Sequence, residues 1–169
     1  MLELVLFAMF GAAMFVTRVI MAALPNIHLL GMFIMVLTLV FRVKALIPLY
    51  LYVFIEGVFA GFDIWWIPYL YIWTILWGIT MLLPKRMPKK VGYFIVPIIC
   101  ALHGLFFGVL YAPLQALLYG YDLEQTLVWI SLGFTFDILH SVGDLFAGML
   151  VIPLADVLRK ILAKSSLNR

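Results

Sequence analysis

Residues 4–24 read LVLFAMFGAAMFVTRVIMAAL, an apolar run in which Arg18 is the only charged residue. A helix needs about 20 consecutive apolar residues to cross the hydrocarbon core of a bilayer. Five further apolar runs follow, and 67% of the 169 residues are hydrophobic while only 11% are charged, against about 25% charged in an average soluble domain. The sequence therefore predicts an all-α integral membrane protein, with residues 1–169 forming a single membrane domain built as a bundle of six transmembrane helices.

We expect the spans at residues 4–24, 29–44, 45–61, 67–83, 91–118 and 125–152, followed by a cytoplasmic tail at 153–169 that begins with a helical extension. The second run is short, which predicts a short or tilted helix. The amino terminus lacks the basic segment and cleavage site of a secretory signal peptide, so we expect the first span to stay in the mature protein. Cys100 is the only cysteine, which excludes disulfides and thiolate metal clusters.

The basic residues are distributed unevenly between the expected loops. Ten of the eleven Lys and Arg residues fall in the loop after the second span, the loop after the fourth span and the tail, and the other three loops hold none. With six spans, these three regions share one side of the membrane only if both termini lie there too. The positive-inside rule makes that side cytoplasmic. Both termini and the Lys85–Lys90 loop are therefore expected inside, and Asp63 and Asp122 outside.

Ionisable side chains within the spans are candidates for a functional site, because burying a charge in the bilayer costs several kcal/mol. Arg18 and Glu56 lie at matching depth near the outer ends of the first and third spans, so the two could meet. The pair would form either the polar wall of an outward-facing cavity or a purely structural ion pair.

Three ionisable residues of the sixth span, Asp137, His140 and Asp144, follow the spacing i, i+3 and i+7. This spacing places them on one helical face, which must point into the bundle. The stripe could hold the bundle together through hydrogen bonds that include His103 of the fifth span. It could instead contact a ligand, or carry metal or proton chemistry.

Aromatic and small residues form two further patterns. Tyr69, Trp73 and Trp77 at i, i+4 and i+8 form one stripe on the fourth span, and flat rings beside a few polar groups suit stacking on a planar heterocycle. Ala8–Ala12 and Gly104–Gly108 carry the small-residue spacing that allows close helix approach in lipid. The sequence contains no nucleotide-binding or hydrolase motif, so active transport would need an energising partner.

In length, helix number and topology the chain resembles the substrate-binding S components of energy-coupling factor (ECF) vitamin transporters. The elements that carry the resemblance are the Ala8–Ala12 motif, the turn at Leu24–Asn26 and the stretch Phe136–His140. The resemblance implies a multi-pass protein of the bacterial plasma membrane with a pocket open to the outside, capped by residues 25–28, 61–66 and 119–124. It also implies that Ala8 and Ala12 dock onto a transmembrane coupling subunit, which connects to two cytoplasmic ATPase subunits.

The expected substrate is a small ring compound, either pyridoxine-like or hydroxymethylpyrimidine-like, with a cobalamin-type or other vitamin as the alternative. No catalytic residue, cofactor, metal or nucleic-acid partner is expected. Alternatives from other classes are a b-type cytochrome, with His103 and His140 as haem ligands, and a scaffold without a ligand. The residues expected to bind the substrate are Arg18, Asn26, His28, Glu56, Asp63, Trp66, Tyr69, Trp73, Trp77, Asp137 and His140.

Overall fold

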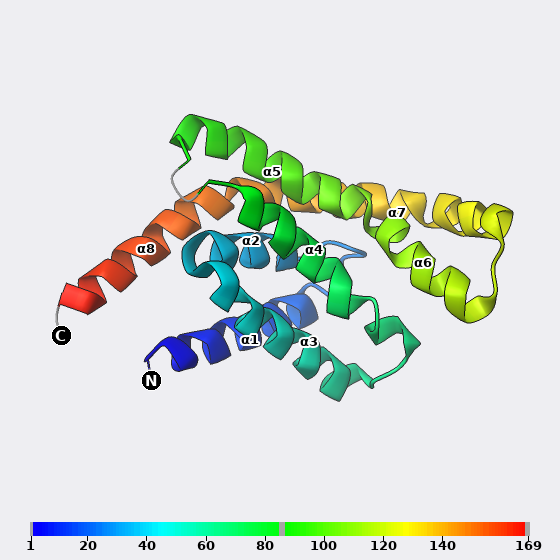
Figure 1. The fold of residues 1–169 in the computed structure, drawn as a ribbon, viewed down its shortest axis with the longest axis horizontal. Helices are drawn as coiled ribbons and strands as arrows, with labels where there is room; N and C mark the ends of the chain where they lie inside the picture. The colour runs from blue at the N-terminus through cyan, green and yellow to red at the C-terminus, as the bar shows by residue number, and fades with distance from the viewer. Residues whose placement is uncertain (1, 85–86, 168–169) are drawn as a thin grey trace.

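A computed structural model describes residues 2–84 and 87–167, and within these ranges it contains helices and no strand (Figure 1). Met1, Lys85 and Arg86 of the expected basic loop, and the last two residues of the tail lie outside the described residues. Five helical segments of the described chain are long and apolar enough to cross a membrane, as expected for a membrane protein. The elements are α1 (Leu2–Ile20), α2 (Leu30–Phe41), η1 (Arg42–Ala45), α3 (Leu46–Ala60), η2 (Ile64–Trp66), α4 (Tyr69–Leu82), α5 (Lys89–Leu105), α6 (Phe107–Tyr119), α7 (Leu123–Met149) and α8 (Val151–Leu167).

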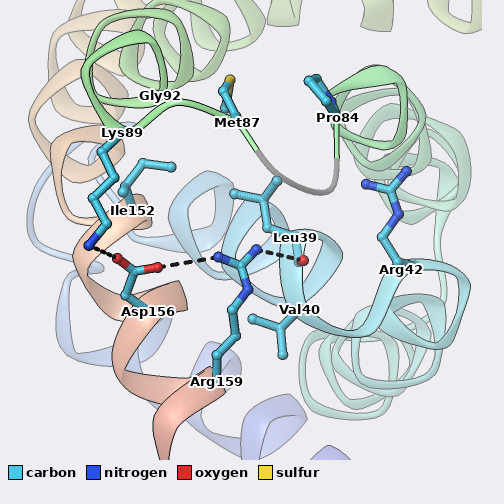
Figure 2. A pocket seen from close by; sticks show the side chains of 10 residues that line it. All are labelled: Leu39, Val40, Arg42, Pro84, Met87, Lys89, Gly92, Ile152, Asp156 and Arg159. Carbon is cyan, nitrogen blue, oxygen red and sulfur yellow. Dashed lines mark hydrogen bonds and ion pairs between the residues drawn. The ribbon is translucent and has the colours of Figure 1, made fainter.

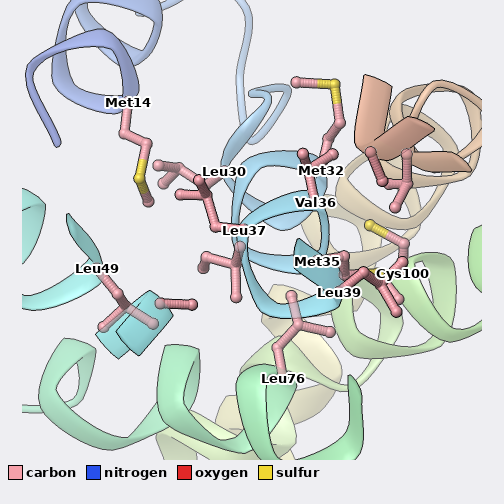
Figure 3. Close-up of a cluster of buried hydrophobic side chains, with 14 of the residues drawn as sticks. Met14, Leu30, Met32, Met35, Val36, Leu37, Leu39, Leu49, Leu76 and Cys100 are labelled. Carbon is pink, nitrogen blue, oxygen red and sulfur yellow. The ribbon is translucent and has the colours of Figure 1, made fainter. Parts of the chain in front are cut away.

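The short helix α2 lies at the centre of the molecule, between α4, α7 and α8 (Figure 1). It has 12 residues and is therefore about 18 Å long. Its side chains are buried on nearly every side, and Met35 and Leu37 pack in the main hydrophobic core (Figure 3). A helix that is hydrophobic all round is stable when it is enclosed, which explains the composition of this segment. The expectation of a short second helix is confirmed.

The chain turns back between α2 and α3 at η1 (Figure 1). Arg42 has a positive φ of 55° there, and its carbonyl accepts a hydrogen bond from Trp77 Nε1 at 3.2 Å. The Arg42 guanidinium in turn donates to the Leu83 carbonyl at the end of α4, at 3.2 Å. These bonds hold the turn against α4.

Helices α1 and α3 then run side by side in the same direction. Lys44 pairs with Glu3 near the start of both helices, at 2.8 Å, and Arg18 pairs with Glu56 near their ends, at 3.1 Å. Gly11 allows the close approach, since a Cβ at this position would lie 2.8 Å from the Leu51 side chain.

Helices α5 and α7 form the most extensive helix pair of the fold, and glycines line the seam between them. A Cβ at Gly104 would lie 3.0 Å from the backbone nitrogen of Ser141, and one at Gly148 would lie 2.7 Å from the Pro97 Cα. The expected small-residue contact at Gly104–Gly108 is therefore a packing seam within the chain. The expected fifth span is interrupted at its middle, where Phe106 separates α5 from α6.

The segment after residue 150 differs from the expected tail. The end of α7 at Met149 is followed directly by α8, which is helical as expected for the extension but begins earlier, at Val151. Val151, Ala155 and Leu158 are buried, and α8 packs against α2. The apolar residues of α8 recur with the period of a helix, so they form one face that packs against α2. This part of the expected tail therefore belongs to the core.

The two ends of the bundle differ in composition (Figure 1). One end, which we call the basic end, contains both termini, η1 and the connection between α4 and α5. The connection between α1 and α2, η2 and the connection between α6 and α7 lie toward the other end, which we call the cavity end. Arg42, Lys89 and Arg159, which come from the three regions rich in Lys and Arg, line one cavity at the basic end.

Candidate functional site

A cavity of about 280 Å³ lies at the cavity end. The last turn of α1 and the connection from α1 to α2 form most of its wall, while α4, α6 and α7 each contribute one aromatic or imidazole ring. The connection therefore acts as the cap of the cavity. The lining residues are Arg18, Met21, Ala22, Leu24, Pro25, Asn26, Ile27, His28, Tyr69, Phe107 and His140.

The cap is shaped by a sequence of turns. The Leu24 N–H donates to the Met21 carbonyl at 2.8 Å, and the Ile27 N–H donates to the Leu24 carbonyl at 3.3 Å. Asn26 has a φ of 55°, a left-handed conformation that asparagine tolerates better than most residues. The turn at Leu24–Asn26 thus folds the chain back, so that His28 reaches the cavity.

The polar wall is formed by Arg18 and Glu56. Arg18 Nε lies 3.1 Å from Glu56 Oε1; the Glu56 side chain is fully buried, and the Arg18 side chain is 34% exposed. The expected meeting of these two residues is confirmed. A guanidinium carries five N–H donors in a planar fork, so Arg18 can neutralise Glu56 and still present donors to a ligand in the cavity.

Aromatic rings form the opposite wall. Trp73 is fully buried behind the lining, with its ring centroid 5.9 Å from that of Tyr69, 5.5 Å from Phe107 and 5.6 Å from His28. Burial lowers the pKa of His28 to about 4, so this imidazole is neutral at pH 7. The wall therefore offers apolar stacking area with a neutral nitrogen at its edge.

Two imidazoles, those of His28 and His140, line the floor of the cavity, and the Asp144 carboxylate lies behind them. The rings of His28 and His140 lie 4.6 Å apart between centroids, and His140 Nε2 lies 3.4 Å from Asp144 Oδ2. Nitrogen or oxygen atoms from all three side chains lie within 4.8 Å of one another. Such a donor set is one that divalent transition metals accept.

The stripe on α7 points into the bundle as expected, because Asp137, His140 and Asp144 are all buried. Its hydrogen bonding differs from the expected network. His103 Nε2 donates a hydrogen bond to the Ile72 carbonyl on α4, at 3.1 Å, and not to the stripe on α7.

Asp137 does not line the cavity either. Both of its carboxylate oxygens accept the Gly108 N–H, at 3.2 Å each. This contact falls near the start of α6, where the helical hydrogen bonding of α5 is interrupted. Asp137 thus serves to hold α6 against α7.

Three aromatic or acidic residues expected at the site have structural partners elsewhere. Asp63 caps η2 by accepting the Ile64 N–H at 2.6 Å. The Trp66 indole donates to the Val53 carbonyl at 2.7 Å, and the Trp77 indole is bound at the basic end, as described above. The cavity thus brings together Arg18, Asn26, His28, Tyr69 and His140 from the expected set, with Glu56 and Trp73 directly behind them.

Phe107 and the lining residues Met21, Ala22 and Leu24 were missed by the sequence reasoning. Phe107 follows His103 by four residues, which indicates a shared inward face, so this signal was available. Of the three segments expected to cap the pocket, residues 25–28 line the cavity, whereas residues 61–66 and 119–124 do not.

A second cavity, of about 520 Å³, lies at the basic end between α2, α5 and α8 (Figure 2). Its charged groups bind one another: Asp156 accepts from Lys89 at 2.8 Å and pairs with Arg159 at 3.3 Å. Arg159 also donates to the Leu39 carbonyl at 3.0 Å. The hydrogen bond from Lys89 holds the pKa of Asp156 below its usual value. This cavity therefore offers a ligand fewer unsatisfied groups than the first.

Comparison of the chain with protein-family models, with curated proteins and with solved structures finds no match. The resemblance to S components therefore stays a prediction, and the function has to be inferred from the cavity and the residues around it.

Proposed function

We propose that the chain is a membrane-embedded capture protein that binds a small ring-containing nutrient outside the cell for import. In this proposal the six spans of the sequence analysis cross the plasma membrane, with both termini and the basic end in the cytoplasm. The cavity end then faces outward.

The observation that supports capture most directly is the composition of the small cavity. Arg18 supplies charged donors, Asn26 a side-chain amide, and Tyr69 and Phe107 supply flat apolar surface. The lining of this concave site exposes more polar than apolar surface, and a few convergent polar groups are what fix the orientation of a ligand in a small-molecule pocket. Its position beneath a turn-rich cap gives the ligand an entrance that does not require the helices to separate.

The size of the cavity bears on the class of substrate. Pockets for drug-sized ligands span roughly 300–1,000 Å³, and about 280 Å³ lies just below this range. A pyridoxine-like or hydroxymethylpyrimidine-like compound suits this volume, whereas a cobalamin-type vitamin is far too large to enter it. The smaller vitamin precursors are thus the favoured class.

The haem alternative is disfavoured by the side chain that occupies the space around the two histidines. The Phe107 ring contacts both imidazoles, with its centroid 6.3 Å from His103 and 5.0 Å from His140. A macrocycle between these residues would have to displace it.

The surface proposed to dock a coupling subunit lies on α1. Ala8 and Ala12 are exposed, whereas Gly11 on the neighbouring face packs against α3. The small-residue surface is therefore left unused by contacts of the described chain, which supports docking of a transmembrane coupling subunit that is energised by two cytoplasmic ATPases.

Ligand extraction followed by mass spectrometry, and calorimetric titration with pyridoxine and hydroxymethylpyrimidine, test the capture proposal. Tyr69→Leu removes stacking area and is expected to weaken binding at least tenfold. Tyr71→Leu is the matched control, since Tyr71 points to the Leu110 carbonyl and does not line the cavity. If the wild-type protein carries no extractable nutrient and binds none of a vitamin panel, the scaffold alternative is favoured instead.

A further inference from the structure

The three residues at the floor of the cavity come from two segments that are far apart in the sequence. His28 ends the cap, whereas His140 and Asp144 lie one turn apart on α7. The side chains of His140 and Asp144 are 2% and 0% exposed. Their convergence at a buried point is a feature of the tertiary structure, and the capture of an organic ring does not account for it.

Asp144 lacks the partners that a buried carboxylate normally has. Among the described residues, neither of its oxygens has a hydrogen-bond partner, and neither does His140 Nε2. A buried carboxylate without donors or a counter-charge is strongly destabilising. The Asp144 carboxyl group therefore either keeps its proton or has a cationic partner.

Two glycines of neighbouring helices pack against the Asp144 carboxylate, beside the imidazole of His140. A Cβ at Gly31 of α2 would lie 3.2 Å from both carboxylate oxygens, and one at Gly104 of α5 would lie 3.1 Å from Oδ2. These glycines bring two helices against the carboxylate and leave no room there for a larger residue that could supply a donor. A small ion approaching from the cavity is the partner that fits.

We propose that His28, His140 and Asp144 together bind one divalent ion of the late first-row transition metals, such as Zn²⁺, Co²⁺ or Ni²⁺. Imidazole nitrogen is a favoured ligand for this class, and one carboxylate neutralises part of its charge. Mg²⁺ and Ca²⁺ prefer sites built from oxygen ligands alone, so a site with two imidazoles disfavours them.

The distances agree with this assignment. Metal bonds of about 2.0–2.1 Å to nitrogen and oxygen place tetrahedral ligands about 3.4 Å apart. His140 Nε2 and Asp144 Oδ2 are already 3.4 Å apart, and the widest separation in the set is within 4.8 Å. An approach of His28 by up to about 1.4 Å would complete the three-ligand geometry, and His28 belongs to a connection that can adjust more readily than α7.

Two consequences follow for the cavity. A metal held by both α7 and His28 fixes the cap to the bundle, so metal binding is expected to order the α1–α2 connection. Three protein ligands leave at least one coordination position open, and this position faces the cavity that His28 and His140 line. The metal site shares the cavity of the proposed capture function and rests on that function to this extent. Metal binding itself can be tested without a nutrient.

Titration of Co²⁺ and Zn²⁺ into the full-length, chelator-treated protein without a histidine tag tests the proposal. We expect saturable binding at one equivalent, with visible d–d absorption for Co²⁺, and protection of residues 21–29 from hydrogen exchange. Loss of an outer-shell partner costs about 10- to 100-fold in metal affinity, so His140→Gln and Asp144→Asn, which remove a ligand, are expected to lose about 100-fold or more. His103→Gln is the matched control, because His103 is buried but bonded to Ile72, and it is expected to bind the metal normally.

The proposal is overturned if the wild-type protein, eluting as a single species, shows no saturable binding. It is equally overturned if His140→Gln and Asp144→Asn bind Co²⁺ as tightly as His103→Gln does. Asp144→Asn removes an uncompensated buried charge and should fold at least as well as the wild type, so its result does not depend on stability. Metal binding without nutrient binding would reject the capture proposal alone, and nutrient binding by metal-free protein that takes up no metal would reject the metal site alone.

Discussion

The basic end and the cavity end contain similar kinds of polar residue but use them differently. At the basic end, Lys44 pairs with Glu3, and Lys89 and Arg159 pair with Asp156. These side chains are between 26% and 71% exposed. At the cavity end, the acidic members Glu56 and Asp144 are fully buried.

The difference separates charges that are paired at the surface from charges that the bundle buries. Exposed pairs of the first kind contribute little to stability, and their common location at one end of an apolar bundle is best explained by membrane sidedness. Buried groups of the second kind are costly unless a partner neutralises them. The cavity end therefore combines one ion pair, Arg18 with Glu56, and one buried acidic group, Asp144, that is proposed to bind an external ion.

The largest expected difference between the two ends is their access from outside the cell. Asp63 and Lys90 are exposed positions toward the cavity end and at the basic end, respectively. In intact cells, Asp63→Cys is expected to react fully with an impermeant maleimide, and Lys90→Cys only after the membrane is opened. The native Cys100 is buried and serves as the internal control. Labelling of position 90 in intact cells, with none at position 63, would reverse the assigned orientation.

A smaller difference is expected in stability when one arginine is removed from each end. Arg18→Met leaves Glu56 buried without its counter-charge and should lower the free energy of unfolding by about 3 kcal/mol. Arg159→Met leaves Asp156 partly exposed and still paired with Lys89, so a loss of about 1 kcal/mol or less is expected. Equilibrium unfolding in mixed micelles measures both values.

The double variant Arg18→Met, Glu56→Gln provides the control for this comparison. Removing the stranded charge should recover most of the stability lost in Arg18→Met. Equal losses for the two arginine variants would show that burial does not distinguish the two ends.

The sequence predicted the parts of the fold that are governed by the cost of burying charge. The sorting of Lys and Arg to one end, the meeting of Arg18 with Glu56, and the inward face of Asp137, His140 and Asp144 all follow from this cost. The short central helix was also predicted, from the length of its apolar run. These features depend on single helices or on the depth of a residue, which sequence spacing determines directly.

Other features depend on which helices are neighbours, and sequence spacing does not determine that. The role of Asp137 arises from an interruption between α5 and α6 that exposes the Gly108 N–H. Trp77 belongs to the aromatic stripe by spacing, yet its indole binds the turn at Arg42. The approach of His28 to Asp144 depends on the path of an aperiodic connection, so the sequence indicated the pairing of His140 with Asp144 on one face but not the position of His28 beside them.

The smallest expected difference between the two ends is in how their stability responds to low pH. Burial lowers the pKa of His28 to about 4 from its ordinary value of 6.5, with Arg18, His103 and His140 as the neighbouring basic groups and Asp144 as the nearest carboxylate. A cap that opens lets His28 take up a proton below pH 6.5, so the closed cap loses stability as the pH falls from 6.5 toward 4, by about 2 kcal/mol at pH 5. At the basic end the pKa of Asp156 is lowered instead, so its pairing persists at pH 5 and weakens only below about pH 4.

Hydrogen exchange without added metal, corrected for the intrinsic effect of pH, should therefore show faster exchange at residues 21–29 on going from pH 7 to pH 5, and no change at residues 151–159. His28→Gln should remove this dependence, whereas equal acceleration at both ends would show that acid loosens the whole bundle and not the cap.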